Sequence, residues 1–170
     1  MPVYFAYGSN MDTSAMAARC PASRQLGPAR LAGRRFVISR EGYASVVRDP
    51  RHTVWGLLWD IAFADMPALD RYESVASGLY VKLNQPVLAA YGSRRALIYV
   101  ARSGGTGQPR PGYLEGVVAA ARAAALPEAY IREIEAWSPQ IAATRQAPAG
   151  AAEPRPVRPL WSSPRARDQG

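Results

Sequence analysis

The sequence predicts one domain that combines β-strands with helices, followed by a short tail. Residues 29–61 contain three β-rich runs separated by turn residues, and residues 111–137 carry the apolar spacing of two helices. A length of 170 residues is typical of a single domain. Hydrophobic residues make up 48% and charged residues 20% of the chain, which is the balance of a soluble protein with a sizeable core.

The amino-terminal segment has the pattern of a strand, a polar loop and a helix. Val3–Ala6 is β-branched and aromatic and is followed by turn residues at 8–10. Residues 12–14 are N-cap candidates for a short helix at 15–19, which Pro21 ends. Free backbone N–H groups and the positive end of a helix dipole then gather around the loop, so the loop suits a carboxylate or another anion.

The next segment predicts an antiparallel meander. We expect its strands at residues 31–39, 44–48 and 54–61, with turns at Arg40–Gly42 and at Asp49-Pro50.

A short helix and two more strands follow the meander. Asp65 is expected to cap a helix at Met66–Glu73, and the strands are expected at 79–83 and 95–101. The Gly- and Pro-rich loop at 103–111 is long enough to have a functional role.

The remainder of the domain is expected to be helical. Pro111 begins a helix through residue 125, whose apolar face is Leu114, Val117, Val118, Ala121 and Ala125. Pro127 begins a second helix, whose inward residues are Tyr130, Ile131, Ile134 and Trp137. After residue 141 the composition changes to Ala, Pro and Arg, so we divide the chain into a domain at 1–141 and a flexible tail at 142–170.

The few cysteines and histidines limit the possible chemistry and location. Cys20 is the only cysteine, so the fold needs no oxidising compartment, and we expect a cytoplasmic protein. No apolar run approaches the ~20 residues that span a bilayer, and the first residues lack a signal-peptide pattern. Cys20 and the single His52 exclude a metal site built mainly from thiolate or imidazole.

Tyr4–Asn10 is the first candidate for chemistry. The pattern also fits an ordinary strand and turn. Gly8, however, lets a ligand approach the backbone, while Ser9 and Asn10 add a hydroxyl and an amide beside the expected helix start.

Leu69–Val75 is the second candidate. Asp70 and Glu73 lie three residues apart on the expected helix, a spacing that also fits a solvated helix face with an ion pair. Glu73 stands at the helix end beside Tyr72 and a run of small residues. Partly apolar surroundings would disfavour its charged form and make it a better general base near neutral pH.

Three separated stretches resemble the gamma-glutamylcyclotransferase-like family, in its bacterial, general γ-glutamyl cyclotransferase form. They are YFAYGSNM at 4–11, VWGLLWDI at 54–61 with LDRYESV at 69–75, and PGYLEGVVAAARAAALPEAYIREI at 111–134. The resemblance covers residues 3–137 and does not include the tail. It implies an α+β fold with a curved mixed, barrel-like sheet flanked by helices, and the conversion of a γ-glutamyl compound to 5-oxoproline and a free amine.

The resemblance also implies roles for individual residues. The catalytic glutamate of the family corresponds to Glu73, and a tyrosine that lines its pocket corresponds to Tyr113. Its substrate-binding loop corresponds to Tyr4, Phe5, Ala6, Tyr7, Gly8 and Ser9, and we add Asn10 because backbone N–H groups here are suited to hold an anion. Ser74 replaces the glycine that usually follows the catalytic glutamate.

We expect a small-molecule γ-glutamyl substrate, no metal or organic cofactor, and no nucleic-acid or membrane partner. In the expected reaction, Glu73 removes a proton from the α-ammonium group, and the amine then closes a ring onto the γ-carbonyl. Two alternatives remain open: an inactive interaction protein on the same fold, and a basic module that uses the net charge of +8 to bind nucleic acid. The YGSN loop favours dipeptide-type substrates, and the sequence leaves the leaving amine and the oligomeric state open.

Overall fold

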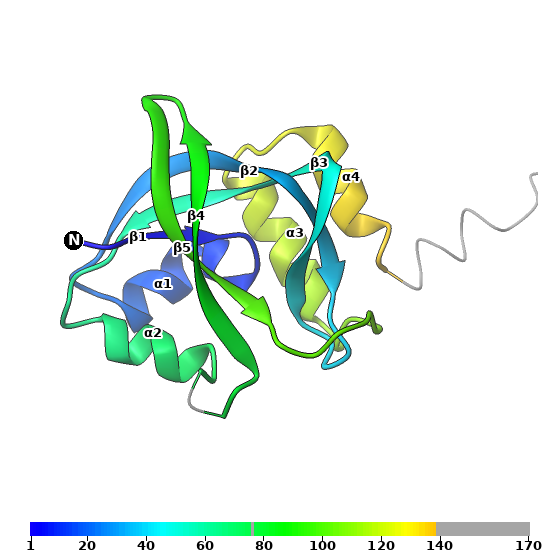
Figure 1. Cartoon of the computed structure of the whole chain (residues 1–170), viewed down its shortest axis with the longest axis horizontal. Helices are drawn as coiled ribbons and strands as arrows, with labels where there is room; N and C mark the ends of the chain where they lie inside the picture. Colours follow the sequence, from blue (N-terminus) through cyan, green and yellow to red (C-terminus); the bar gives the residue numbers. More distant parts are fainter. Residues whose placement is uncertain (76, 139–170) are drawn as a thin grey trace, which may run out of the picture.

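The computed structural model of the protein describes residues 1–75 and 77–138, so the predicted tail at 142–170 lies outside the described residues. Within them, strands close into a barrel in the order β1-β3-β2-β4-β5 (Figure 1). The strands are β1 (Val3–Ala6), β2 (Arg24–Ile38), β3 (Ala44–Asp60), β4 (Tyr80–Ala89) and β5 (Gly92–Ala101). Most neighbours are antiparallel, but β1 and β5 are parallel where Tyr4 meets Leu97. The predicted α+β fold with a curved mixed, barrel-like sheet is therefore confirmed.

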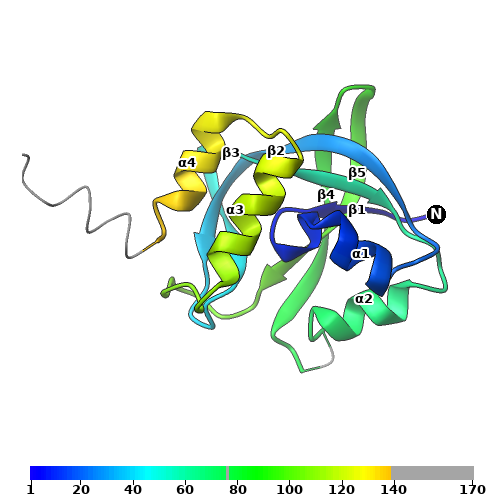
Figure 2. The ribbon, with the colours of Figure 1, turned by 180° about the vertical axis from the view of Figure 1, so that it is seen from behind.

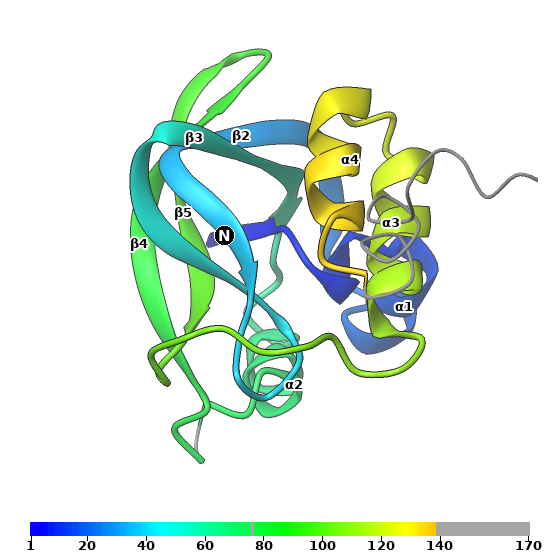
Figure 3. The ribbon, with the colours of Figure 1, turned by 90° about the vertical axis from the view of Figure 1, so that its right-hand side faces the viewer.

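The helices cover one side and one end of the barrel. They are the 3-10 helix η1 (Ser9–Met11), α1 (Thr13–Arg19), α2 (Met66–Tyr72), α3 (Tyr113–Ala123) and α4 (Glu128–Glu135). Figures 2 and 3 show α3 and α4 side by side against the barrel, with α2 at the lower end. Helix α1 contacts η1. None of the described helices has both the length and the apolar character needed to cross a membrane.

The apolar faces of α3 and α4 pack on the barrel largely as the periodicity predicts. Leu114, Val117 and Ala121 of α3 are buried, as are Tyr130, Ile131 and Ile134 of α4. The prediction that the first helix extends from Pro111 to Ala125 is wrong at both ends. Gly112 has a φ of 75° at the N-cap, and Ala125 is exposed with a φ of 51° because the helix has already ended.

The predicted three-strand meander is instead a hairpin of two long strands. β2 begins at Arg24 rather than at residue 31, and β3 continues through the predicted turn at Asp49-Pro50. Ala32 pairs with Thr53 and Arg34 pairs with Arg48, so β3 makes a four-residue excursion opposite a single residue of β2. Proline cannot donate to a ladder, and a bulge is one of the few places where a strand tolerates it.

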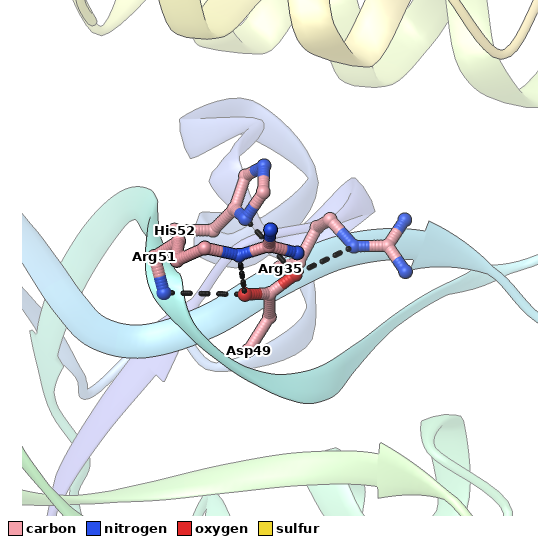
Figure 4. Close-up of polar contacts among 4 residues, drawn as sticks. All are labelled: Arg35, Asp49, Arg51 and His52. Atoms are coloured by element: carbon pink, nitrogen blue, oxygen red, sulfur yellow. Dashed lines mark hydrogen bonds and ion pairs between the residues drawn. The ribbon is translucent and has the colours of Figure 1, made fainter.

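A carboxylate organises this excursion. The backbone N–H of Arg51 donates to Asp49 Oδ1 at 3.1 Å. His52 Nδ1 lies 3.0 Å, and Arg35 Nε 3.5 Å, from Asp49 Oδ2 (Figure 4). The turn signal in the sequence therefore marks a change of register inside a strand.

The two later strands and α2 lie where the sequence predicts them, but the strands are longer than predicted and the cap of α2 differs. The strands at 79–83 and 95–101 belong to a continuous hairpin in which Tyr80 pairs with Ala101 and Ala89 with Gly92. Asp65 precedes α2 but does not cap it with its side chain. Its carboxylate accepts instead from Ala22 N at 2.9 Å and Ser23 Oγ at 2.7 Å, which fastens the start of α2 to the turn between α1 and β2.

Candidate active site

A cavity of about 210 Å³ opens between the amino-terminal loop, the end of α2, the start of α3 and strands β4 and β5. Seven of the nine tyrosines of the chain line it: Tyr4, Tyr7, Tyr43, Tyr72, Tyr80, Tyr99 and Tyr113. Among the described lining residues, Glu73 is the only one with a charged side chain. The cavity thus surrounds one carboxyl group with phenol rings.

Glu73 is the C-cap residue of α2, and two side chains from the amino-terminal segment hold its carboxyl group. Its N–H donates to Leu69 O at 3.0 Å, so the helix fixes its backbone. Asn10 Nδ2 donates to Glu73 Oε1 at 2.8 Å, and the Tyr4 hydroxyl donates to the same oxygen at 3.3 Å. Asn10 Nδ2 also donates to the Tyr4 hydroxyl at 3.0 Å, which completes a three-residue network.

The environment of Glu73 favours proton exchange near neutral pH. Burial raises the pKa of Glu73 to about 7, against the lowering effects of the Tyr4 hydroxyl, the Arg19 charge and the Asn10 amide. A carboxyl group with this pKa is present in both protonation states near neutral pH, so it can accept a proton and return it.

The loop between β1 and η1 approaches the opposite wall of the cavity closely. A Cβ atom on Gly8 would lie 3.0 Å from the Tyr113 hydroxyl oxygen and 3.1 Å from Ala44 Cβ, so glycine allows this approach. Ala44 N donates to the Tyr113 hydroxyl at 3.1 Å and fixes the ring at the start of α3. Burial raises the pKa of Tyr113 to about 12, so its phenol is neutral at ordinary pH.

Most of the predicted site residues lie together. The cavity is lined by Glu73, Tyr4, Tyr7, Gly8, Ser9, Asn10 and Tyr113. Phe5 and Ala6 belong to the same loop motif but are fully buried and do not line the cavity. They connect the loop to the core of the barrel.

Asp70, the other carboxylate of the second motif, has different partners. Its Oδ1 accepts from the Tyr99 hydroxyl at 2.7 Å, and its Oδ2 accepts from Lys82 Nζ at 2.6 Å. These contacts occupy both oxygens and tie α2 to strands β4 and β5. The spacing of Asp70 and Glu73 therefore does not indicate a pair of carboxylates that share one site.

Local sequence patterns did not indicate four of the tyrosines that line the cavity, nor Arg19 beside it; the tyrosines are Tyr43, Tyr72, Tyr80 and Tyr99. Tyr80 and Tyr99 lie in strands, where an aromatic residue is expected in the core. Tyr80 donates to Ala44 O at 2.8 Å, so its phenol has a polar partner inside the fold. The high proportion of tyrosine among the aromatic residues, nine against three phenylalanines, was the available signal, because a buried phenol needs a partner that phenylalanine does not.

Comparison with known proteins finds similarity in sequence and in fold. Residues 53–134 match the AIG2-like family. A gamma-glutamylcyclotransferase from Homo sapiens is 28% identical over 148 residues, which cover 81% of this chain and 79% of that protein. One from Mus musculus is also 28% identical, with the same coverage of 81% and 79%.

A solved structure of a gamma-glutamyl cyclotransferase has the same fold. It superposes with a TM-score of 0.73 at 26% identity and covers 79% of this chain and 86% of its own. The sequence relatives, the family match and the shared fold together confirm the resemblance that the three motifs indicate: the chain is similar in sequence and in fold to gamma-glutamylcyclotransferases.

Proposed function

We propose that this protein is a γ-glutamyl cyclotransferase that releases 5-oxoproline and a free amine from a γ-glutamyl compound, with Glu73 as its general acid and base. The similarity to gamma-glutamylcyclotransferases supports the reaction class. One observation carries the role of Glu73: it is the only charged side chain among the described lining residues, and Tyr4 and Asn10 hold its carboxyl group in place.

The binding of substrate follows from the charges of a γ-glutamyl group. Its α-ammonium group is assigned to Glu73, which also removes the proton. Its α-carboxylate, or the oxyanion that forms at the γ-carbonyl, is assigned to backbone N–H groups of residues 7–10. Gly8 is the N-cap of η1, and among the described residues no side chain caps that helix, which supports this assignment. Tyr113 and the other phenols supply neutral walls.

Proton transfers accompany each bond change in the reaction. Glu73 takes a proton from the α-ammonium group, and the freed nitrogen attacks the γ-carbonyl carbon. The tetrahedral intermediate then collapses, the bond to the leaving amine breaks, and Glu73 returns its proton to that amine. The surplus proton on the ring nitrogen passes to the regenerated carboxylate and leaves with the released amine or with water.

Positioning makes a large contribution to such a reaction. The nucleophile and the carbonyl belong to one molecule, so the cavity mainly has to select the folded-back conformation of the substrate. Acyl transfer of this kind needs only a proton acceptor and an oxyanion stabiliser, so we propose that the enzyme uses no metal or organic cofactor.

We infer that the substrates are of the dipeptide type and that the protein works in the cytoplasm. The Tyr4–Asn10 loop favours dipeptide-type substrates, as the sequence indicates. Cys20 is buried and is the only cysteine, so the fold does not depend on a disulfide. A γ-glutamyl polyamine or another γ-glutamyl amine would enter through the same site, and a substrate panel distinguishes them.

The test measures 5-oxoproline release from a panel of γ-glutamyl dipeptides, glutathione and γ-glutamyl amines. Two blocked ligands define the binding mode by calorimetry. We expect that amidation of the α-carboxylate strongly weakens binding, and that acylation of the α-amine permits binding without turnover. An absence of 5-oxoproline from the whole panel, with tight and salt-sensitive binding of a short oligonucleotide, would overturn the proposal.

A further inference from the structure

Arg19, the last residue of α1, contacts two residues of the candidate site from behind. Its Nη1 donates to the side-chain oxygen of Asn10. Its guanidinium carbon lies 3.3 Å from the centroid of the Tyr72 ring, so the two planar groups are in close contact. Arg19 is partly buried and is not among the residues that line the cavity.

The contact with Asn10 determines which way its amide points. A guanidinium group has only donors, so the amide oxygen has to face Arg19 and the amide nitrogen has to face the other way. In that orientation Nδ2 donates to Glu73 Oε1 at 2.8 Å and to the Tyr4 hydroxyl at 3.0 Å. The opposite orientation would place the amide oxygen against the Glu73 carboxylate, where two acceptors repel each other.

The second contact of Arg19 holds the ring of Tyr72, the residue that directly precedes Glu73. Tyr72 is 45% exposed, so the core holds only part of its ring. Its hydroxyl lies 2.9 Å from Ser9 Oγ, across the cavity mouth from α2. Arg19 thus joins the end of α2, through Tyr72, to the amino-terminal loop, through Asn10.

We propose that Arg19 is a positioning residue for Glu73: its guanidinium orients the Asn10 amide toward the carboxylate and packs the end of α2 against the amino-terminal loop. The proposal rests on the function proposed above for Glu73. It adds a residue of α1 that never touches the substrate but sets the geometry and charge around the base.

The charge of Arg19 acts on Glu73 across the Asn10 amide. Lys82, a cation of β4, is instead paired with Asp70 at 2.6 Å. The titratable groups that face Glu73 from the surrounding elements are Tyr4, Tyr7, Asp70, Tyr80, Tyr99, Tyr113 and Arg19. The Arg19 charge lowers the pKa of Glu73 and opposes the effect of burial.

The experiment compares Arg19→Gln, Arg19→Lys and a matched control, Arg71→Gln, in the full chain. Arg71 is an exposed arginine of α2 two residues before Glu73, so its replacement removes the same charge without touching Asn10. Two readouts are measured: the titration of the Glu73 carboxyl carbon by NMR on ¹³C-labelled protein, and the pH profiles of kcat and kcat/KM for 5-oxoproline release.

We expect Arg19→Gln to raise the titration midpoint of Glu73 by about one pH unit. Such a shift from a midpoint near 7 lowers the ionised fraction at pH 7 about five-fold. The fall in kcat at pH 7 is expected to exceed that factor and to reach at least ~10-fold, because the base is also misplaced. Arg19→Lys should keep the midpoint close to that of the wild type but still lower kcat, since an ammonium group lacks the planar fork that contacts Asn10 and Tyr72 together. Arg71→Gln should match the wild type in both readouts.

A wild-type midpoint and wild-type pH profiles in Arg19→Gln would overturn the proposal. If Arg19→Gln fails to fold, Arg19→Lys decides, and wild-type kcat in that variant overturns the proposal. The carboxyl titration is independent of turnover. If the wild type makes no 5-oxoproline, the proposed function fails, while the titration still decides whether Arg19 acts on Glu73.

Discussion

Glu73 and Asp49 are two carboxylates in different surroundings, and their pKa values are shifted in opposite directions. Burial raises the pKa of Glu73 to about 7. The pKa of Asp49 is lowered to about 2, chiefly by the backbone N–H of Arg51 and further by His52 and the Arg51 side chain. Both groups are partly removed from bulk water: Glu73 is partly buried, and the Asp49 side chain is only 13% exposed.

The difference lies in what covers each group. Asp49 is surrounded by Arg35, Arg51 and His52, so its charge is matched from several sides. Glu73 is surrounded by phenols and one amide, and its cation is one step away behind Asn10. Donated hydrogen bonds and close cations stabilise an ionised carboxylate, whereas burial among neutral groups raises the pKa of a carboxyl group toward neutral pH. A charge-rich environment therefore indicates a structural carboxylate, and a neutral enclosure indicates a reactive one.

The largest expected effect comes from Glu73→Gln. The amide keeps the shape of the side chain but accepts no proton, so the rate of 5-oxoproline release should fall by about 10²–10⁴. Circular dichroism checks that the fold is intact, and Glu133→Gln, at an exposed position of α4, is the matched control. Near-wild-type release by Glu73→Gln would contradict the assignment of Glu73 as the general acid and base.

The second effect is a pH dependence of stability with opposite signs for the two carboxylates. Below its ordinary pKa of 4.5, Glu73 is protonated in both the folded and the unfolded chain. As the pH rises from 4.5 to about 7, the unfolded chain ionises first, so the free energy of unfolding falls by at most ~3 kcal/mol. Asp49 contributes stability above pH 3.8 that is lost as the pH falls to about 2.

Urea unfolding of the wild type and Glu73→Gln at pH 4.5, 6 and 8 measures this effect. The wild type should lose stability relative to the variant across that interval. Parallel stability curves would show that Glu73 does not titrate near neutral pH in the folded state.

Ser74→Gly tests the backbone directly after the base. Ser74 has a φ of 52°, a conformation that costs a non-glycine residue about 1 kcal/mol or more. Glycine relieves that cost but gains entropy in the unfolded chain, so the net stabilisation should be about 0.5 kcal/mol. Ala125→Gly is the matched control, with a φ of 51° at a position outside the cavity. A fall in melting temperature for Ser74→Gly alone would mean that the serine side chain contributes more than its backbone costs.

Asp49→Asn should have a smaller effect that leaves catalysis intact. It removes the charge that holds Arg35, Arg51 and His52, so the melting temperature should fall slightly. The fall should shrink at high salt, because exposed ion pairs are screened, and it should vanish as the pH approaches 2. A loss of turnover in this variant would contradict the division between structural and reactive carboxylates.

The smallest expected effect is that of deleting the tail. Residues 142–170 are rich in Pro, Ala and Arg, so we expect their removal to change neither turnover nor melting temperature. Leu160 and Trp161 are the residues to test if this fails. A loss of activity or a melting temperature lowered by many degrees would move the domain boundary beyond residue 141.

Local sequence signals were sufficient where they matched the tertiary fold. Strand β1, the α1 start capped by Asp12, and the apolar face of α4 were all predictable, because each follows from alternation, capping or helical spacing. The Gly8 loop and Glu73 were identified as candidates from their residue types and from the family resemblance. That the loop and Glu73 lie side by side could not be predicted from local sequence, since 63 residues separate Asn10 from Glu73 and only the tertiary fold brings them within one hydrogen bond.

The wrong strand and turn predictions have a common physical cause: long-range strand pairing overrides local turn signals. Asp49-Pro50 is a typical turn sequence, yet it lies within β3 at a change of register against β2. Arg19 is the basic residue in the last turn of α1, and its contact with Asn10 depends on how α1 packs against the amino-terminal loop. No local pattern carries such information.

The ring of phenols around Glu73 also gives the protein a built-in optical signal. Seven tyrosines line the cavity, while Tyr91 and Tyr130 lie elsewhere. A bound molecule would displace water from these rings and change their near-ultraviolet absorption and circular dichroism. Ligand binding should therefore be measurable by difference spectroscopy on the unlabelled protein, even for compounds that are never turned over.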